Sequence, residues 1–221
     1  MFSKRDVYLW IVSVLFIVFS FMVFDRCNYL ILLASIIGVT SLIFNARGNY
    51  IGQLLMIVFS ILYGIISYGF SYYGEMITYL LMTAPMALFA LISWLKNPYQ
   101  GREVKVNTLT YKEVIFMMIL AIIVTSIFYR ILVYYHTANI IFSTISITTS
   151  FIAVYLTFRR SAYFALAYAS NDIVLIVLWI LASMFDRSYI SVVVCFIVFL
   201  VNDIYGFVSW QKMKVRQETK K

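Results

Sequence analysis

The chain contains few of the residues that soluble enzymes and metal sites depend on. Only 12% of its 221 residues are charged, whereas soluble domains have about 25%. Its two cysteines, Cys27 and Cys195, lie far apart without a pairing motif, and a single histidine, His136, cannot build a metal site. These shortages exclude an ordinary soluble domain, a disulfide framework and a metal centre, and we expect no cofactor.

Long uncharged stretches take the place of the missing charges. No charged residue lies between Gly48 and Gly74, between Met76 and Leu95, or between Thr137 and Phe158. A membrane-spanning helix needs about 18 or more apolar residues, and a segment inside a bilayer must be helical to satisfy its backbone. The sequence therefore predicts an all-α integral membrane protein with eight transmembrane helices, over residues 7–24, 29–46, 51–70, 76–95, 114–135, 139–158, 162–184 and 189–210.

The first of these segments is expected to be a retained helix, because no small-residue cleavage site follows Phe24. The placement of the basic residues predicts its orientation. With the N-terminus inside, fourteen Lys and Arg residues face the cytoplasm and only Arg26, Arg130 and Arg187 face outward. This bias predicts a multi-pass membrane protein with both termini cytoplasmic. It also accounts for the net charge of +8, because basic residues on the cytoplasmic side face anionic lipid headgroups. No nucleic-acid partner is therefore expected.

One short phrase occurs twice, as Ser93-Trp94-Leu95-Lys96 and as Ser209-Trp210-Gln211-Lys212. A second match aligns 47–50, Arg-Gly-Asn-Tyr, with 160–163, Arg-Ser-Ala-Tyr. Spans two to four and six to eight are then two copies, and four spans separate matching helices, so both copies run in the same direction. The predicted architecture is an N-terminal helix (1–27), a three-helix bundle (28–96), a cytoplasmic loop with a linker helix (97–137), a second three-helix bundle (138–211) and a basic tail (212–221).

A hydrophobic chain built from two copies of one unit is typical of a membrane carrier whose substrate site lies between the copies. Two further features of the repeat lead to structural predictions. Trp94 and Trp210 are expected to anchor their helices at the membrane interface, and Pro85 is expected to bend the fourth span.

Two acids lie inside predicted spans, Asp172 and Asp203, and each follows an asparagine. A charge at a helix centre is costly in a membrane, so such residues face the bundle interior. No lysine or arginine lies deep enough in a span to pair with them. We interpret the acids as substrate or ion contacts; the alternative is that they lock helices together through hydrogen bonds.

Helical spacing extends this candidate site. Residues 164, 168, 171 or 172 and 179 share one face of the seventh span, residues 202, 205 and 209 share one face of the eighth, and a polar stripe at 53, 60, 63 and 67 marks the third. Aromatic planes with amides and carboxylates suit a ring joined to a sugar, although an aromatic stripe alone is also typical of packing. The predicted substrate-binding residues are Asn171, Asp172, Phe164, Tyr168, Gln53, Asn202, Asp203, Tyr205 and Trp179. The run of small polar residues 143–150 is expected to serve helix packing.

The chain resembles the Pnu family of bacterial transporters from about Tyr29 to its end. The resemblance rests on the Arg47-Gly48 loop into Tyr50-Ile51-Gly52, the helix from Pro85 to Trp94, the Arg159-Arg160 loop, and the run 204–210, Ile-Tyr-Gly-Phe-Val-Ser-Trp. It implies a SWEET-like fold of two parallel three-helix bundles. It also implies facilitated diffusion of a solute that a cytosolic kinase then traps without forming a stable complex.

The chain departs from this family at one motif. Members that carry nicotinamide riboside are similar in having two tryptophans on the seventh span, followed by an asparagine; here the positions are Phe164, Ala167 and Asn171. The preferred substrate is therefore an uncharged nucleoside or deoxynucleoside. Nicotinamide riboside and thiamine remain alternatives, because buried acids attract a cationic ring.

Two other functions remain open at this stage, as does a homo-oligomer. The first is a vitamin-binding subunit that needs an ATP-driven partner to transport. The second is an intramembrane enzyme with Asp172 and Asp203 as an aspartyl dyad, but the order of the helices does not favour it. The sequence has no catalytic Ser-His pair, and we predict no enzyme.

Overall fold

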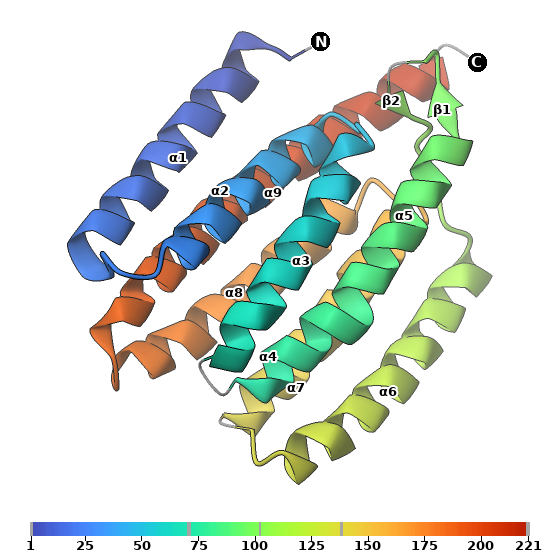
Figure 1. The fold of residues 1–221 in the computed structure, drawn as a ribbon. Coiled ribbons are helices and arrows are strands. Elements are labelled where there is room, and N and C mark those ends of the chain that lie inside the picture. The colour runs from blue at the N-terminus through green and yellow to red at the C-terminus, as the bar shows by residue number, and fades with distance from the viewer. Residues whose placement is uncertain (1, 70–71, 102, 138, 220–221) are drawn as a thin grey trace.

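The chain forms a bundle of long helices (Figure 1). The computed structural model describes residues 2–69, 72–101, 103–137 and 139–219, and eight of its helical segments are long and apolar enough to cross a membrane. They are α1 (Lys4–Phe24), α2 (Tyr29–Ala46), α3 (Ile51–Gly69), Tyr73–Lys96, α6 (Tyr111–Tyr134), α7 (Ile140–Phe158), α8 (Phe164–Ser183) and Arg187–Thr219. The predicted fold class and the predicted number of spans are confirmed.

The fourth and eighth segments are composite. The fourth consists of α4 (Tyr73–Ile77), a π-helical turn η1 (Thr78–Thr83) and α5 (Ala84–Lys96). Pro85 lies in the first turn of α5 and has no N–H to donate to the preceding turn. The helix is irregular just before Pro85, where the π-helical turn lies, and the bend expected at Pro85 stays a prediction. The eighth segment begins with a short 3-10 turn, η2 (Arg187–Tyr189), and continues as α9 (Ile190–Thr219).

The basic tail predicted from residue 212 is not a separate segment, since α9 continues without a break to Thr219. A small antiparallel hairpin, β1 (Pro98–Tyr99) and β2 (Glu103–Val104), packs beside it. The side-chain amide of Gln217 donates to the carbonyl of Val104 at 3.1 Å and accepts from the N–H of Val106 at 2.9 Å. This pairing holds the last turns of the helix against the hairpin, so the predicted boundary at residue 211 is wrong. Residues 220–221 lie outside the described part of the chain.

Both termini lie at one end of the bundle, together with the hairpin (Figure 1). Because the helices alternate in direction, the α2–α3 and α7–α8 turns lie at this end too, with Arg47, Arg159 and Arg160. We call it the basic end. The turns that carry Arg26 and Arg187 lie at the opposite end.

The helix contacts follow a two-fold pattern. The first helix of each predicted bundle packs against the last helix of the other, so that α2 lies against α9 and α7 lies against α5. Helices α1 and α6 lie at opposite edges of the bundle (Figure 1), where α1 contacts α2 and α9 and α6 contacts α7. The predicted two-copy arrangement accounts for these pairings.

The turns at the basic end correct the alignment of the copies by one residue. Helix α2 ends at Ala46, and Gly48 then adopts a left-handed φ of +62°. Helix α7 ends at Phe158, and Arg160 adopts a left-handed φ of +56°. A left-handed residue commonly terminates a helix, so Gly48 and Arg160 are equivalent, and the sequence match of Arg47 with Arg160 is one position out.

Trp94 and Trp210 are not interfacial anchors. Their side chains are only 2% and 0% exposed, and their rings touch with centroids 5.4 Å apart. The indole of Trp94 donates to the carbonyl of Thr157 at 3.0 Å, and that of Trp210 donates to the carbonyl of Asn45 at 2.7 Å. Each tryptophan therefore joins its own half to the end of the first helix of the other half, and the anchor prediction is wrong.

Candidate binding site

Two buried acids meet where α8 packs against α9. Asp172 and Asp203 are each 4% exposed, and their carboxyl groups lie within hydrogen-bonding contact of each other. One oxygen of Asp172, Oδ2, has no hydrogen-bond partner among the described residues. The half-buried Tyr168, one helical turn before Asp172, lies close enough to interact electrostatically with both acids. These three residues form the centre of the candidate site.

An aromatic layer closes this centre toward the basic end. Phe164, which begins α8, is 2% exposed and packs edge-on against Trp210 at 4.8 Å and Trp94 at 6.2 Å between ring centroids. Eight residues of helix separate Phe164 from Asp172, a rise of roughly 12 Å. The layer thus draws on α5, α8 and α9, which belong to both halves.

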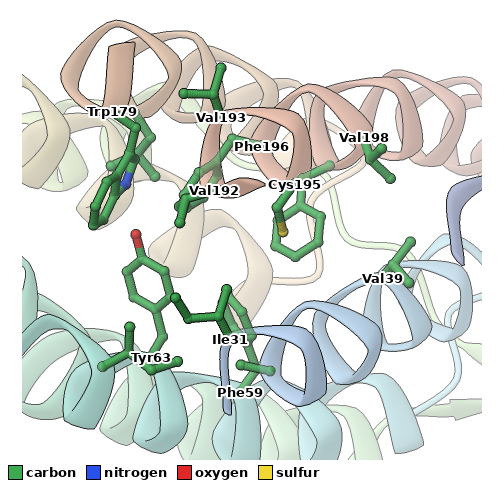
Figure 2. Close-up of a cluster of buried hydrophobic side chains, with 14 of the residues drawn as sticks. Ile31, Val39, Phe59, Tyr63, Trp179, Val192, Val193, Cys195, Phe196 and Val198 are labelled. Carbon is green, nitrogen blue, oxygen red and sulfur yellow. The ribbon is translucent and has the colours of Figure 1, made fainter. Parts of the chain in front are cut away.

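A second aromatic layer lies on the other side of the acids. Tyr63 of α3 and Tyr79 of η1 pack at 4.4 Å between ring centroids, and Tyr63 contacts Trp179 of α8 at 6.2 Å. Figure 2 shows the Tyr63 hydroxyl directed at Trp179. Tyr79 also lies near enough to Asp172 to interact electrostatically with it. The acid pair is therefore enclosed between aromatic layers, each with side chains from both halves.

Comparison with known proteins shows the family of the chain. The family model described as nicotinamide mononucleotide transporter matches residues 28–212. The chain belongs to this family. A search of curated proteins found no match. Among solved structures, one described as the crystal structure of the vitamin B3 transporter PnuC is similar, with a TM-score of 0.86 and 21% identity over 98% of this chain and 94% of that chain. Membership places the chain among transporters, not enzymes, although the acid pair has the composition of an aspartyl dyad.

The structure does not bring all nine predicted substrate-binding residues together in one site. Tyr168, Asp172 and Asp203 meet at the centre, while Phe164 and Trp179 belong to the two layers. The remaining four, Asn171, Gln53, Asn202 and Tyr205, have other partners.

Asn171 faces α7 instead of the acid pair. Its side-chain carbonyl accepts hydrogen bonds from Thr149 at 2.8 Å and from Ser150 at 3.0 Å. Neighbouring residues on a helix point about 100° apart, so Asn171 and Asp172 cannot face the same helix. The predicted packing role of the small polar run 143–150 is confirmed by these contacts.

Gln53, Asn202 and Tyr205 lie in polar contacts away from the centre. The Gln53 amide donates to Asn45 at 2.8 Å. Asn202 donates to Ser13 of α1 at 2.9 Å, and the Tyr205 hydroxyl donates to Asp6. The last two contacts arise because α1 packs against α9, on a face that the sequence could not assign to it. The predicted inward-facing stripe of α3 is nevertheless confirmed, since Gln53, Ser60, Tyr63 and Ser67 are all buried.

Sequence reasoning missed two residues of the transporter that lie beside the site. Glu75 is 3% exposed and lies one position before the predicted start of the fourth span, so it was counted as part of a loop. Tyr79 is 7% exposed and occupies the π-helical turn. The only available signal was Pro85, which marks an irregular helix without locating the irregular turn. Irregular turns of this kind are frequent at functional sites.

Proposed function

We propose that this chain carries nicotinamide riboside, a vitamin B3 nucleoside, across the membrane by facilitated diffusion. The family description names a nicotinamide nucleotide, and the similar structure is that of a vitamin B3 transporter. Both support a pyridine-containing solute over the (deoxy)nucleoside that the two absent tryptophans favoured. The choice between nucleoside and nucleotide rests on charge.

One observation carries this choice. Among the described residues, the buried Asp, Glu, Lys and Arg side chains are all acids, namely Asp6, Glu75, Asp172 and Asp203. Asp6 is paired with Arg47, but Asp172 and Asp203 face each other without a cation. Because the two carboxyls contact each other, one proton lies between them and the pair carries at most one negative charge; a phosphate beside that charge would be repelled in a medium that screens poorly. A pyridinium ring would supply the missing positive charge, so the riboside is favoured over the mononucleotide.

The proposed binding mode uses the centre of the site. The cationic ring faces Asp172 and Asp203 and lies against Tyr168 and Tyr79, where aromatic faces also attract a cation. The ribose hydroxyls donate to carboxylate oxygens, including the unpartnered Oδ2 of Asp172. Rocking of the two halves would open one aromatic layer at a time, as in other carriers built from repeats.

In facilitated diffusion the solute gradient, and not the orientation of the chain, sets the direction of net uptake. We propose that the basic end faces the cytoplasm of a bacterial cell, in agreement with the positive-inside bias. A cytosolic kinase then phosphorylates the solute, and the product no longer fits the acidic site. One copy of the chain supplies both aromatic layers, so the proposed site is complete within one copy.

The test is uptake into liposomes that contain the purified protein and no ATP. We expect saturable uptake of radiolabelled nicotinamide riboside and little uptake of the mononucleotide, thymidine or thiamine. Binding of the riboside without uptake would instead indicate a subunit of an ATP-driven importer. Preferential uptake of thymidine would return the assignment to a deoxynucleoside carrier.

A charge test addresses the acid pair directly. The Asp172→Asn variant should bind nicotinamide riboside about tenfold or more weakly, the loss expected for one charge contact worth about 1.4 kcal/mol. Reduced nicotinamide riboside has almost the same shape but an uncharged ring, and its affinity should change much less. Equal losses for both compounds would show that the carboxylate does not recognise charge.

A further inference from the structure

Glu75 is a buried acid to which the central site gives no role. It lies in α4, near the end opposite the basic end, and is 3% exposed. Its Oε2 atom has no hydrogen-bond partner among the described residues, and neither has the hydroxyl of the nearby stripe residue Ser67. A buried, unpaired carboxyl is costly in a membrane protein and commonly marks a functional site.

Aromatic rings gather around this acid. Tyr63, Tyr72 and Tyr79 each lie close enough to Glu75 to interact electrostatically with it. The rings contact one another as well: Tyr63 and Tyr79 at 4.4 Å, and Tyr72 and Trp179 at 5.1 Å between centroids. We call Glu75, Tyr63, Tyr72, Tyr79, Trp179 and Tyr189 the outer cage, since Tyr189 packs on Trp179 at 5.5 Å.

We propose that the outer cage is a second binding site, which takes a flat organic cation such as an N-substituted pyridinium. The faces of tyrosine and tryptophan rings attract cations, and the attraction grows when water is excluded. Glu75 adds a buried carboxyl oxygen, Oε2, that has no partner among the described residues and can face a cation. The combination of several rings and one acid favours a ligand that is flat and positively charged. It provides few hydrogen-bonding groups for a sugar and no basic side chain for a phosphate among the named residues.

The outer cage is continuous with the acid pair. Tyr79 belongs to the cage and lies close enough to interact electrostatically with both Glu75 and Asp172. Tyr72 and Tyr189 are only half-buried, so they form the part of the cage nearest the surface at this end. A cation that enters between them would reach Glu75 first and Asp172 next. That the cage binds the solute before the acid pair does depends on the proposed transport of a cationic solute. That the cage binds a cation at all is inferred from the geometry of the cage alone.

The test measures binding of 1-methylnicotinamide, a cationic pyridinium without ribose, by calorimetry on the full chain in detergent. The uncharged ring of nicotinamide serves as the matched probe. We expect Glu75→Gln to weaken binding of 1-methylnicotinamide at least about tenfold and to leave the weak binding of nicotinamide unchanged. Asp25→Asn, which removes another acid in a turn at the same end and away from the cage residues, should change neither affinity and so controls for a general loss of negative charge.

A second pair of variants covers the case in which Glu75→Gln does not fold. Tyr72→Leu removes a half-buried ring that belongs to the cage alone and should weaken 1-methylnicotinamide binding, whereas Tyr72→Phe keeps an aromatic face and should retain most of it. Wild-type affinity in Glu75→Gln would overturn the proposal. So would a loss of binding in Asp172→Asn but not in Glu75→Gln, because the cation would then lie at the acid pair. Binding is measured without transport, so a failure of riboside uptake would leave this result intact.

Discussion

Asp6 and Glu113 occupy equivalent positions in the two halves of the molecule. Each is the third residue of a helix that opens with a reciprocal capping box, Asp6 in α1 and Glu113 in α6. Each also binds the arginine that follows the next helix, Arg47 in one half and Arg159 in the other. Helix α1 therefore has a counterpart in α6, although the sequence comparison left the first span outside the repeat.

The two acids differ in burial, which leads to the first prediction. Asp6 is fully buried and accepts hydrogen bonds from Arg47 and Tyr205, whereas the side chain of Glu113 is 28% exposed. Burial opposes the charge of Arg47, but the hydrogen bonds and charge of Asp6 raise the pKa of Arg47 above its ordinary value. Asp6→Asn should lower the free energy of unfolding by about 2 kcal/mol, and Glu113→Gln by about 0.5 kcal/mol. Denaturant unfolding in detergent would measure both; equal losses would contradict the assigned difference in burial.

The second prediction concerns the crossed tryptophans. Trp94→Phe and Trp210→Phe each leave a buried carbonyl, that of Thr157 or Asn45, without its indole donor. Each carbonyl keeps a backbone donor, the N–H of Arg160 or of Gly48, so each substitution should cost about 0.5–1.5 kcal/mol of stability for the lost hydrogen bond. The rings of Trp94 and Trp210 touch, so the double variant should deviate from the sum of the single ones.

Trp10→Phe provides the control for this prediction. Trp10 is 36% exposed and donates to the hydroxyl of Thr40, which lies at the surface of the bundle. Its replacement should cost less than either buried substitution. If all three variants unfolded alike, the tryptophans would not be joining the two halves.

The third prediction separates the packing role of Asn171 from a role in binding. Asn171→Ala removes the acceptor of Thr149 and Ser150 and should lower stability by about 1–2 kcal/mol. Thr149→Val combined with Ser150→Ala removes the same hydrogen bonds but keeps the amide. If Asn171 serves only to pack α7 against α8, both changes should destabilise the protein and neither should alter riboside affinity when measured below the unfolding temperature. Loss of affinity in Asn171→Ala alone would restore this residue to the binding site.

The general architecture could be predicted from composition and spacing. Uncharged runs of spanning length can only be helices in a bilayer, so the eight spans were predicted, all but the eighth close to their observed bounds. The repeated Ser-Trp motif indicated two copies, and the twofold pairing of α2 with α9 and α7 with α5 agrees with it. The two intramembrane acids were also identified from sequence, because a charge in an apolar run is conspicuous.

Which side chains face one another was decided only by the tertiary structure. Asn171 and Asp172 are neighbours in sequence, but a helix turns about 100° between them, so one reaches α7 and the other reaches Asp203 on α9. Trp94 and Trp210 were read as surface anchors because sequence places them at helix ends, and only the crossing of the halves buries them. Glu75 acquires two rings of its aromatic cage, Trp179 and Tyr189, from segments distant in the chain. Sequence by itself thus determined which segments lie in the membrane, since that depends on the polarity of each segment alone; the contents of the site depend on helix rotation and packing, which are set by all the helices together.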